Sequence, residues 1–192
     1  MDITIVPILV GRLNRDKESK FGSLLAPFLE KQDTFCVVSS DFCHWWVGYL
    51  IREQRLLLTQ LRGSRFSYTY YYPEPPPSDT PAVSLSSSSL PPTLSSHPIH
   101  SSISALDHEA MDLLTLPPST ASEAHDKFTQ YLTRTKNTIC GRHPIGVLFG
   151  ALTAIEDAGL SPRVKWVRYE QSSQCVDISD SSVSYASAYV VF

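Results

Sequence analysis

The sequence has 192 residues, a length typical of one compact domain, with 16 Lys+Arg against 19 Asp+Glu and a formal net charge of −3. This balance argues against nucleic acid as a partner, and no apolar stretch approaches the roughly 18 residues that membrane insertion of a helix requires. The four cysteines lack Cys-x-x-Cys spacing and no secretory signal is recognisable, so we expect a cytoplasmic protein, with the nucleus as a second compartment.

Residues 1–46 have the pattern of an α/β segment. Residues 3–10 form a near-continuous apolar run of strand length, which is typical of a strand covered on both faces, and Pro7 favours an edge or bulged position within it. The apolar residues of 16–30 fall on one helical face, and residues 34–39 predict a second buried strand. A strand, a helix and a strand are therefore predicted in this order.

Two stretches interrupt this pattern. Residues 47–64 predict a short amphipathic helix and are interpreted as an insertion, either a retained intron or a lineage-specific addition. Residues 73–122 hold ten of the 14 prolines and thirteen serines, and we expect 73–100 to be a disordered insert, because this composition buries too little apolar surface to offset chain entropy. His97 and His100 are close enough to chelate a metal, although histidines in such a linker are more often solvated.

Residues 101–192 resume the α/β pattern. Three helices are predicted at 103–114, 123–135 and 144–158, and two strands at 164–169 and 184–191. Strands that alternate with helices indicate an α/β fold, with a central, mostly parallel or mixed sheet flanked by helices. Without the inserts roughly 125 residues remain, which is enough for one core.

Three polar segments carry the candidate chemistry. Asp41, Cys43 and His44 directly follow the predicted strand 34–39, and α/β folds gather ligand-binding groups at the carboxyl ends of strands. A carboxylate beside an imidazole fixes its tautomer, raises its basicity or shares a metal with it. The alternative is structural: Asp41 caps a turn, His44 packs against Trp45, and Cys43 fills the core.

The second segment surrounds Cys140. Pro144 is well placed as the first residue of the helix 144–158, so Cys140 is expected near a helix N-terminus, beside Arg142 and His143. These neighbours favour a thiolate, which serves as a nucleophile, a redox-sensitive group or a soft metal ligand; a buried structural cysteine is the alternative. No nucleophile elbow surrounds Cys140, which argues against a hydrolase.

The third segment, residues 171–175, is rich in hydroxyl and amide groups. Together, the three segments resemble a known protein family. The matching segments are residues 39–45, 137–146 and 171–175, supported by 5–11 and 65–71. In this order they closely resemble the Memo family, whose members mediate cell motility downstream of receptor tyrosine kinases. The Memo-like parts of the sequence are residues 1–46, 65–72 and 101–192.

The resemblance implies a fold similar to class III extradiol dioxygenases, with a cleft that holds copper or iron between two histidines and one cysteine. Cys140 matches the cysteine ligand, and Asp41 and His44 match residues that line the pocket. Arg142 and His143 are expected to line it too. The two histidine ligands belong to family segments that this sequence does not contain. We therefore expect a form truncated at its N-terminus that binds the metal weakly or not at all.

For function, the resemblance implies a metal-binding signalling or scaffold protein linked to cell motility and redox state, with a pocket for a phosphotyrosine-containing peptide. The resemblance argues against an enzyme, and we assign no catalytic residue. One alternative is a metal-dependent, dioxygenase-like oxidoreductase in which Asp41 supplies a carboxylate and His44 an acid–base group. Another is a fragment that neither folds nor binds.

Overall fold

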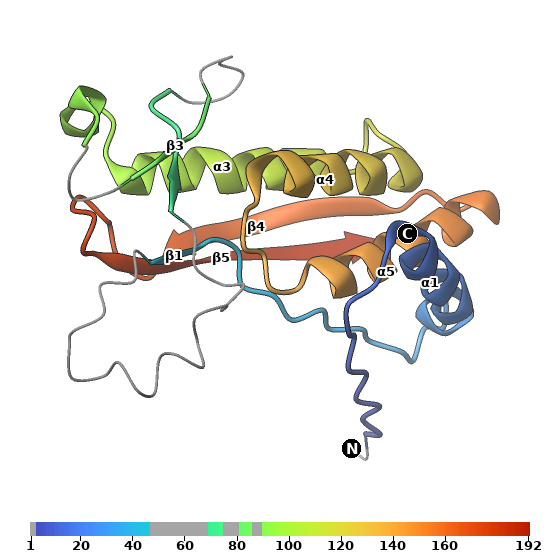
Figure 1. Ribbon diagram of the computed structural model, residues 1–192. Coiled ribbons are helices and arrows are strands. Elements are labelled where there is room, and N and C mark those ends of the chain that lie inside the picture. The colour runs from blue at the N-terminus through green and yellow to red at the C-terminus, as the bar shows by residue number, and fades with distance from the viewer. Residues whose placement is uncertain (1–2, 47–68, 75–80, 86–89) are drawn as a thin grey trace.

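The computed structural model describes residues 3–46, 69–74, 81–85 and 90–192 (Figure 1). The helices are α1 (Arg15–Leu29), the 3₁₀ helix η1 (Pro92–Ser95), α3 (Ile99–Leu113), α4 (Ala121–Thr135) and α5 (Arg142–Asp157). The strands are β1 (His44–Trp46), β2 (Tyr70–Tyr71), β3 (Val83–Ser84), β4 (Arg163–Gln171) and β5 (Ser181–Val191). The α/β class is confirmed, while the insertion predicted at 47–64 lies outside the described residues. Within those residues, no helix has the length and apolar character needed to cross a bilayer.

The main sheet has three strands in the order β1-β5-β4, and both pairs are antiparallel. In the central strand β5, Val183 lies opposite His44 of β1, and Val190 lies opposite Val164 of β4. A second antiparallel sheet joins β2 and β3. The described pairs thus differ from the predicted mostly parallel or mixed sheet. The reason is that β4 and β5 are consecutive strands joined by a loop, whereas parallel neighbours need a longer crossover.

Two predicted strands, 3–10 and 34–39, are not strands in the structure. Ile5, Leu9 and Phe35 in these segments are 78%, 99% and 91% exposed. An apolar run becomes a strand only where a neighbouring strand satisfies its backbone groups, and none of the described strands pairs with either segment. The prediction of these two strands was therefore wrong. An apolar sequence pattern shows which conformation the side chains favour, but it does not show whether a neighbouring strand is present to pair with.

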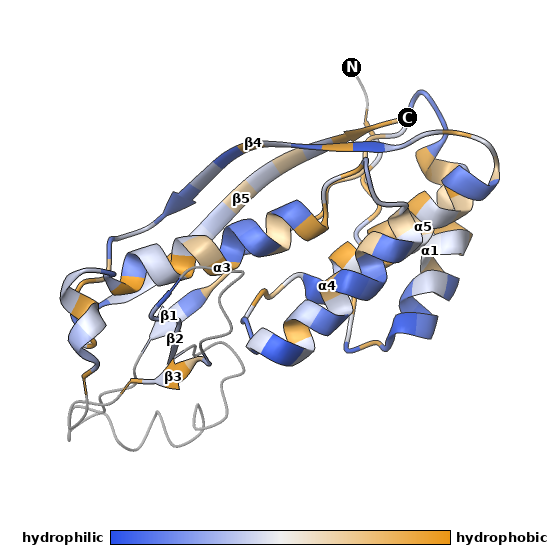
Figure 2. Ribbon diagram, turned by 90° about the horizontal axis from the view of Figure 1, so that it is seen from above, coloured by the Kyte–Doolittle hydropathy of each residue, from blue (hydrophilic) through white to orange (hydrophobic). Residues whose placement is uncertain are grey.

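Helices α1 and α5 lie close together, and α4 lies along the other side of α5 (Figure 2). At Gly22 of α1, a Cβ atom would be 2.4 Å from the backbone nitrogen of Ala151. At Gly150 of α5, a Cβ atom would be 2.7 Å from the carbonyl oxygen of Glu18. The two helices thus touch backbone to backbone, a contact that larger residues at these positions would prevent.

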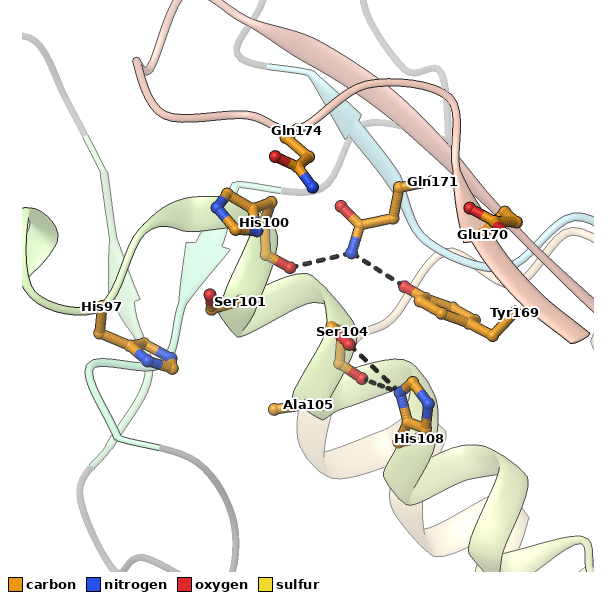
Figure 3. Close-up of a pocket in the computed structure, with 10 residues that line it drawn as sticks. All are labelled: His97, His100, Ser101, Ser104, Ala105, His108, Tyr169, Glu170, Gln171 and Gln174. Carbon is orange, nitrogen blue, oxygen red and sulfur yellow. Dashed lines mark hydrogen bonds between the residues drawn. The ribbon is translucent and has the colours of Figure 1, made fainter.

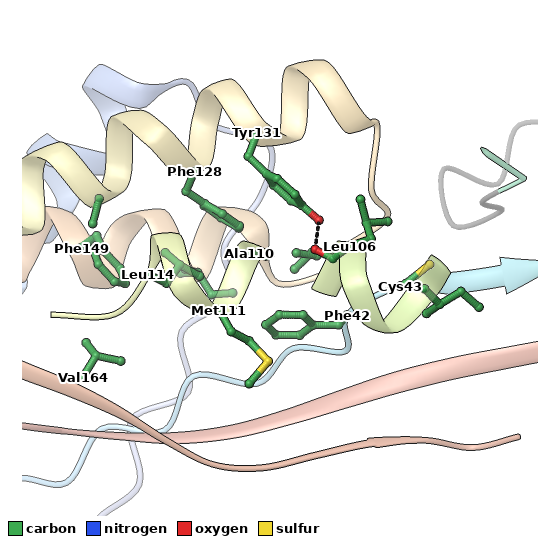
Figure 4. Close-up of a cluster of buried hydrophobic side chains, with 14 of the residues drawn as sticks. Phe42, Cys43, Leu106, Ala110, Met111, Leu114, Phe128, Tyr131, Phe149 and Val164 are labelled. Atoms are coloured by element: carbon green, nitrogen blue, oxygen red, sulfur yellow. Dashed lines mark hydrogen bonds between the residues drawn. The ribbon is translucent and has the colours of Figure 1, made fainter. Parts of the chain in front are cut away.

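Helix α3 covers one face of β4 and β5 (Figure 1). Trp166 Nε1 on β4 donates to the carbonyl oxygen of Met111 at 2.8 Å, and the Tyr169 hydroxyl donates to Asp107 Oδ2 at 2.9 Å. Figure 4 shows the core that this helix forms with α4 and the strands. Its buried side chains include Phe42, Leu106, Leu114, Phe128, Tyr131 and Val164. The opposite face of the strands is less covered, and Tyr185 there is 47% exposed.

The described parts of residues 73–100 include strand β3 and the 3₁₀ helix η1. Strand β3 pairs with β2, and Leu85 after it is only 4% exposed. The Tyr71 hydroxyl donates to the carbonyl oxygen of His97 at 2.5 Å, and the Tyr72 N–H donates to Ser102 Oγ at 2.9 Å. A few apolar and backbone contacts thus connect these residues with the start of α3, while the disordered insert at 73–100 stays a prediction. Residues 75–80 and 86–89 lie outside the described residues.

Candidate metal centre

Asp41, His44 and Cys140 converge in the folded chain. A carboxylate oxygen, an imidazole nitrogen and the thiol sulfur all lie within 4.8 Å of one another. In the described part of the chain, no other group of three or more His, Cys, Asp or Glu side chains meets this condition. The structure thus brings together two segments that are almost a hundred residues apart in the sequence.

Backbone hydrogen bonds hold these two segments against each other. The Asp41 N–H donates to Cys140 Sγ at 3.1 Å, and the Cys140 N–H donates to the Asp41 carbonyl oxygen at 3.2 Å. The Gly141 N–H donates to Ser40 Oγ at 3.0 Å. A Cβ atom at Gly141 would be only 2.3 Å from the Cβ of Ser40, so glycine is required where these two segments of the chain approach each other.

Strand pairing fixes the position of His44. The Phe42 N–H donates to the Ser184 carbonyl oxygen at 2.9 Å, and the Ser184 N–H donates to the Cys43 carbonyl oxygen at 3.0 Å. The His44 N–H donates to Thr138 Oγ1 at 2.9 Å. Cys43 is fully buried, and burial raises its pKa well above the ordinary value, so its thiol is a core group as expected.

The surroundings favour a neutral imidazole at His44. Burial lowers the pKa of His44, and the Asp41 carboxylate, with its Oδ2 atom 3.8 Å from His44 Nε2, opposes this only in part. The neutral imidazole is the form that binds metal ions. Cys140 is exposed and the Asp41 side chain is 42% exposed. The group is therefore accessible from solvent.

Helix α5 begins at Arg142, two residues before the predicted start at Pro144. Cys140 still lies just before its first turn, where the helix dipole is positive. Arg142 and His143, which were expected to line the pocket, occupy this turn. His143 Nδ1 forms a hydrogen bond with Glu18 Oε1 at 2.6 Å, so its ring is held by α1.

Two further charged or polar residues, Glu18 and His125, were not among the residues predicted from the sequence. Glu18 is 6% exposed, and its second oxygen, Oε2, lies 2.8 Å from His125 Nε2. Burial raises the pKa of Glu18, but the hydrogen bonds and charges of His125 and His143 outweigh this effect, and the pKa is lowered. The available signal was spacing, since Glu18 shares the buried stripe of α1 with Gly22 and Ala26.

The third polar segment, residues 171–175, supplies no member of the ligand group. It meets β1 at a cavity of about 300 Å³ that His44 and Trp46 line on one side and Ser172 on the other. The Ser172 N–H donates to the carbonyl oxygen of Val183 at 2.9 Å, which fixes the loop against β5. The first and third segments therefore share a cavity beside the candidate metal centre.

Comparison with known proteins identifies one family. The family model described as Memo-like protein matches residues 1–189. The chain is 37% identical over 191 residues to Protein MEMO1 of Xenopus tropicalis, covering 99% of this chain and 49% of that protein. It is 37% identical over 186 residues to Protein MEMO1 of Homo sapiens (96% and 48%) and 36% identical over 197 residues to the MEMO1 family protein MHO1 of Saccharomyces cerevisiae (98% and 52%). The chain thus spans about half the length of the curated relatives it matches.

Proposed function

The chain belongs to the Memo-like protein family, and on this premise we propose that it is a metal-binding signalling or scaffold protein of the cytoplasm, linked to cell motility and redox state. The proposed ion is copper or iron. Cys140 is the proposed ligand, with Asp41 and His44 beside it. The observation that supports this proposal is the convergence of their ligand atoms within 4.8 Å.

The donor set suits such an ion. Thiolate is a soft ligand that favours copper, imidazole suits both copper and iron, and a carboxylate adds negative charge. Three donors close the site less completely than four protein ligands do, so we expect weak binding. When bound, the ion supplies a Lewis-acidic or redox-active centre. The contribution of the chain is to hold the thiol and the imidazole in place through β1 and the turn before α5.

The proposed partner is a phosphotyrosine-containing peptide. A phosphate group accepts hydrogen bonds and carries negative charge, for which His44 is a suitable donor. The first turn of α5 contains no acidic residue of its own, but the Glu18 carboxylate lies against it through His143, so His44 is the main proposed donor to the phosphate. The exposed part of Trp46, in the cavity of about 300 Å³ beside His44, offers an apolar surface for an aromatic ring.

Copper titration tests the metal proposal. Cu(II) is added to the purified chain, and absorption from thiolate-to-copper charge transfer is recorded together with the affinity. We expect Cys140→Ser to abolish this absorption and to weaken binding, because the variant lacks the thiolate. Cys36→Ser is the matched control, since Cys36 is also a free, exposed cysteine, and it should behave like the parent. An unchanged absorption band in Cys140→Ser would overturn the proposal.

Peptide titration tests the partner. A tyrosine peptide is compared with its phosphorylated form by calorimetry, for the parent chain and for His44→Ala. We expect binding only of the phosphorylated form, and weaker binding by His44→Ala, because the imidazole donor is lost. Equal affinity of parent and variant would remove His44 from this role.

A second candidate function is a metal-dependent oxidoreductase with an extradiol dioxygenase-like fold. The proximity of Asp41 Oδ2 and His44 Nε2, 3.8 Å apart, favours it, because a carboxylate beside an imidazole suits acid–base work. Oxygen uptake by the iron-loaded chain in the presence of a catechol is the test. Uptake that is lost in His44→Gln supports this function, whereas metal binding without turnover excludes it and leaves the signalling proposal.

A further inference from the structure

A larger cavity, of about 600 Å³, lies between helix α3 and the end of β4 (Figure 3). Three histidines line it: His97 before α3, His100 in the first turn and His108 two turns further along. Gln171 at the end of β4 and Gln174 in the following loop line the other side. None of these residues belongs to the candidate metal centre, and the proposed function uses none of them.

The cavity follows one face of α3, and its shape limits the ligand. Ser101 and Ser104 line it between His100 and His108, at the spacing of residues on one side of a helix. From His100 to His108 the helix rises about 12 Å. A volume of about 600 Å³ is within the usual range for sites that bind small molecules. An elongated small ligand therefore fits better than a single ion.

The ionisable groups of the cavity favour an anion. Its lining includes three imidazoles and one carboxylate, that of Glu170, which already accepts a hydrogen bond from Arg168 at 3.1 Å. Burial lowers the pKa of His97, and electrostatic repulsion from the nearby His100 lowers it further. An anion bound beside both would offset this repulsion and accept their N–H groups.

On the side of the cavity lined by Gln171 and Gln174, the Gln171 side-chain oxygen lacks a hydrogen-bond donor among the described residues. Gln171 Nε2 donates to the carbonyl oxygen of His100 at 2.9 Å and to the Tyr169 hydroxyl at 3.1 Å, which fixes the orientation of its amide. Gln171 Oε1 is then an acceptor that is buried without a hydrogen-bond partner among the described residues. Figure 3 shows this oxygen pointing toward Gln174. A hydroxyl group of a ligand would satisfy it.

We propose that this cavity binds a phosphate monoester of a small polyhydroxylated molecule. The phosphate lies beside His97 and His100, and the hydroxyl-bearing part extends along α3 past Ser104, opposite Gln171. Phosphate supplies acceptors for the imidazoles, and the hydroxyl groups supply the donor that Gln171 lacks. Both chemical features are needed, so neither a neutral sugar nor free phosphate should bind as tightly.

Proton NMR of the histidine rings locates the ligand directly. The chain has six histidines, each with its own ring signals: His44, His97, His100, His108, His125 and His143. We expect glucose 6-phosphate to shift the signals of His97, His100 and His108 saturably, and to leave those of His125 and His143 in place. Inorganic phosphate should shift the same signals with weaker affinity, and glucose should shift none. Glucose that binds as tightly as its phosphate ester would overturn the proposal.

Variants test whether the ligand occupies this cavity. The double variant His97→Gln and His100→Gln should weaken binding of glucose 6-phosphate about tenfold or more, because the two imidazole donors beside the phosphate are removed. Lys127→Gln, at an exposed position of α4 outside both cavities, is the control and should bind like the parent. Thermal unfolding of each variant checks that it is folded. Undiminished binding by the double variant, shifts confined to His44, or no shift at millimolar ligand would each overturn the proposal.

Discussion

The Glu18 carboxylate on α1 binds His125 of α4 and His143 of α5, so a single side chain connects three helices. Its side chain is 8% exposed. We expect Glu18→Gln to lower the free energy of unfolding by about 2–4 kcal/mol, because the buried His125 and the partly buried His143 lose their charged partner. Urea denaturation measures the loss. Glu30→Gln, at the exposed end of α1, is the control and should change the free energy by less than about 0.5 kcal/mol. Similar losses in both variants would contradict this role.

Asp107 on α3 is a second buried carboxylate, fully shielded from solvent. It accepts hydrogen bonds from Asn137 Nδ2 at 2.9 Å, from the Tyr169 hydroxyl at 2.9 Å and from the Ser184 hydroxyl. Burial raises the pKa of Asp107 from 3.8 to about 6, and these hydrogen bonds oppose the shift only in part. The folded chain therefore binds this proton more tightly than the unfolded chain does.

The raised pKa of Asp107 predicts a stability that depends on pH. Its stabilising contribution is fully present below about pH 3.8 and is lost as the pH rises through about 6. We expect the free energy of unfolding of the parent, relative to Asp107→Asn, to fall by about 2 kcal/mol between pH 4 and pH 7. Urea denaturation of both proteins across this range measures the difference. A difference that stays constant with pH would show that Asp107 titrates normally.

At the scale of elements, the contact between α1 and α5 depends on glycine. At Gly22, a Cβ atom would lie 2.4 Å from the backbone nitrogen of Ala151 and 2.4 Å from the carbonyl oxygen of Val147. Alanine favours a helix by about 1 kcal/mol over glycine, but backbone atoms this close cannot yield without separating the helices. We therefore expect Gly22→Ala to lower the free energy of unfolding by a net 1–3 kcal/mol or so.

Thermal and urea denaturation of Gly22→Ala measure this effect. Gly11→Ala is the matched control, because a Cβ atom at Gly11 would meet nothing within 4 Å, and it should leave stability unchanged. An increase in stability for Gly22→Ala would mean that helix propensity outweighs the helix contact and that α1 and α5 are more loosely packed.

The helices were predictable because each carries its own signals. Helix α4 has its apolar spacing and begins with Thr120 as N-cap, and α5 ends just before Gly159, whose φ of 94° is left-handed. The segments 3–10 and 34–39 have strand-like patterns, but strand formation depends on partners that a pattern does not reveal. The same limit applies to Glu18, because only packing of three helices brings it to its histidines.

The proximity of Asp41, His44 and Cys140 agrees with the family resemblance, while metal binding by Cys140 stays a prediction. Family resemblance singled out Asp41, His44 and Cys140, and the structure brings them together. The hydrogen bond from the Asp41 N–H to Cys140 Sγ, and the close approach of Ser40 to Gly141, depend on tertiary geometry. Periodicity and composition contain no information on such contacts.

At the scale of the whole molecule, the described residues expose apolar surface in several places, among them two unpaired segments and the outer face of the sheet. The segments 3–10 and 34–39 expose Leu9 at 99% and Phe35 at 91%, and the outer face of β5 exposes Tyr189 at 47%. Unpaired strand-like segments and contiguous apolar surface favour association between molecules. The free chain therefore presents to solvent side chains of the type that normally form a core.

We expect the purified chain to self-associate at micromolar concentration and to bind a hydrophobic dye, since association buries this apolar surface. The double variant Leu9→Lys and Phe35→Lys should reduce both effects while changing the free energy of unfolding by less than about 0.5 kcal/mol, because both side chains are already exposed. Ser23→Lys, at an exposed polar position of α1, should leave association unchanged. Sedimentation velocity distinguishes these outcomes. A parent chain that sediments as a monomer without dye binding would show that the two segments are covered within the molecule itself.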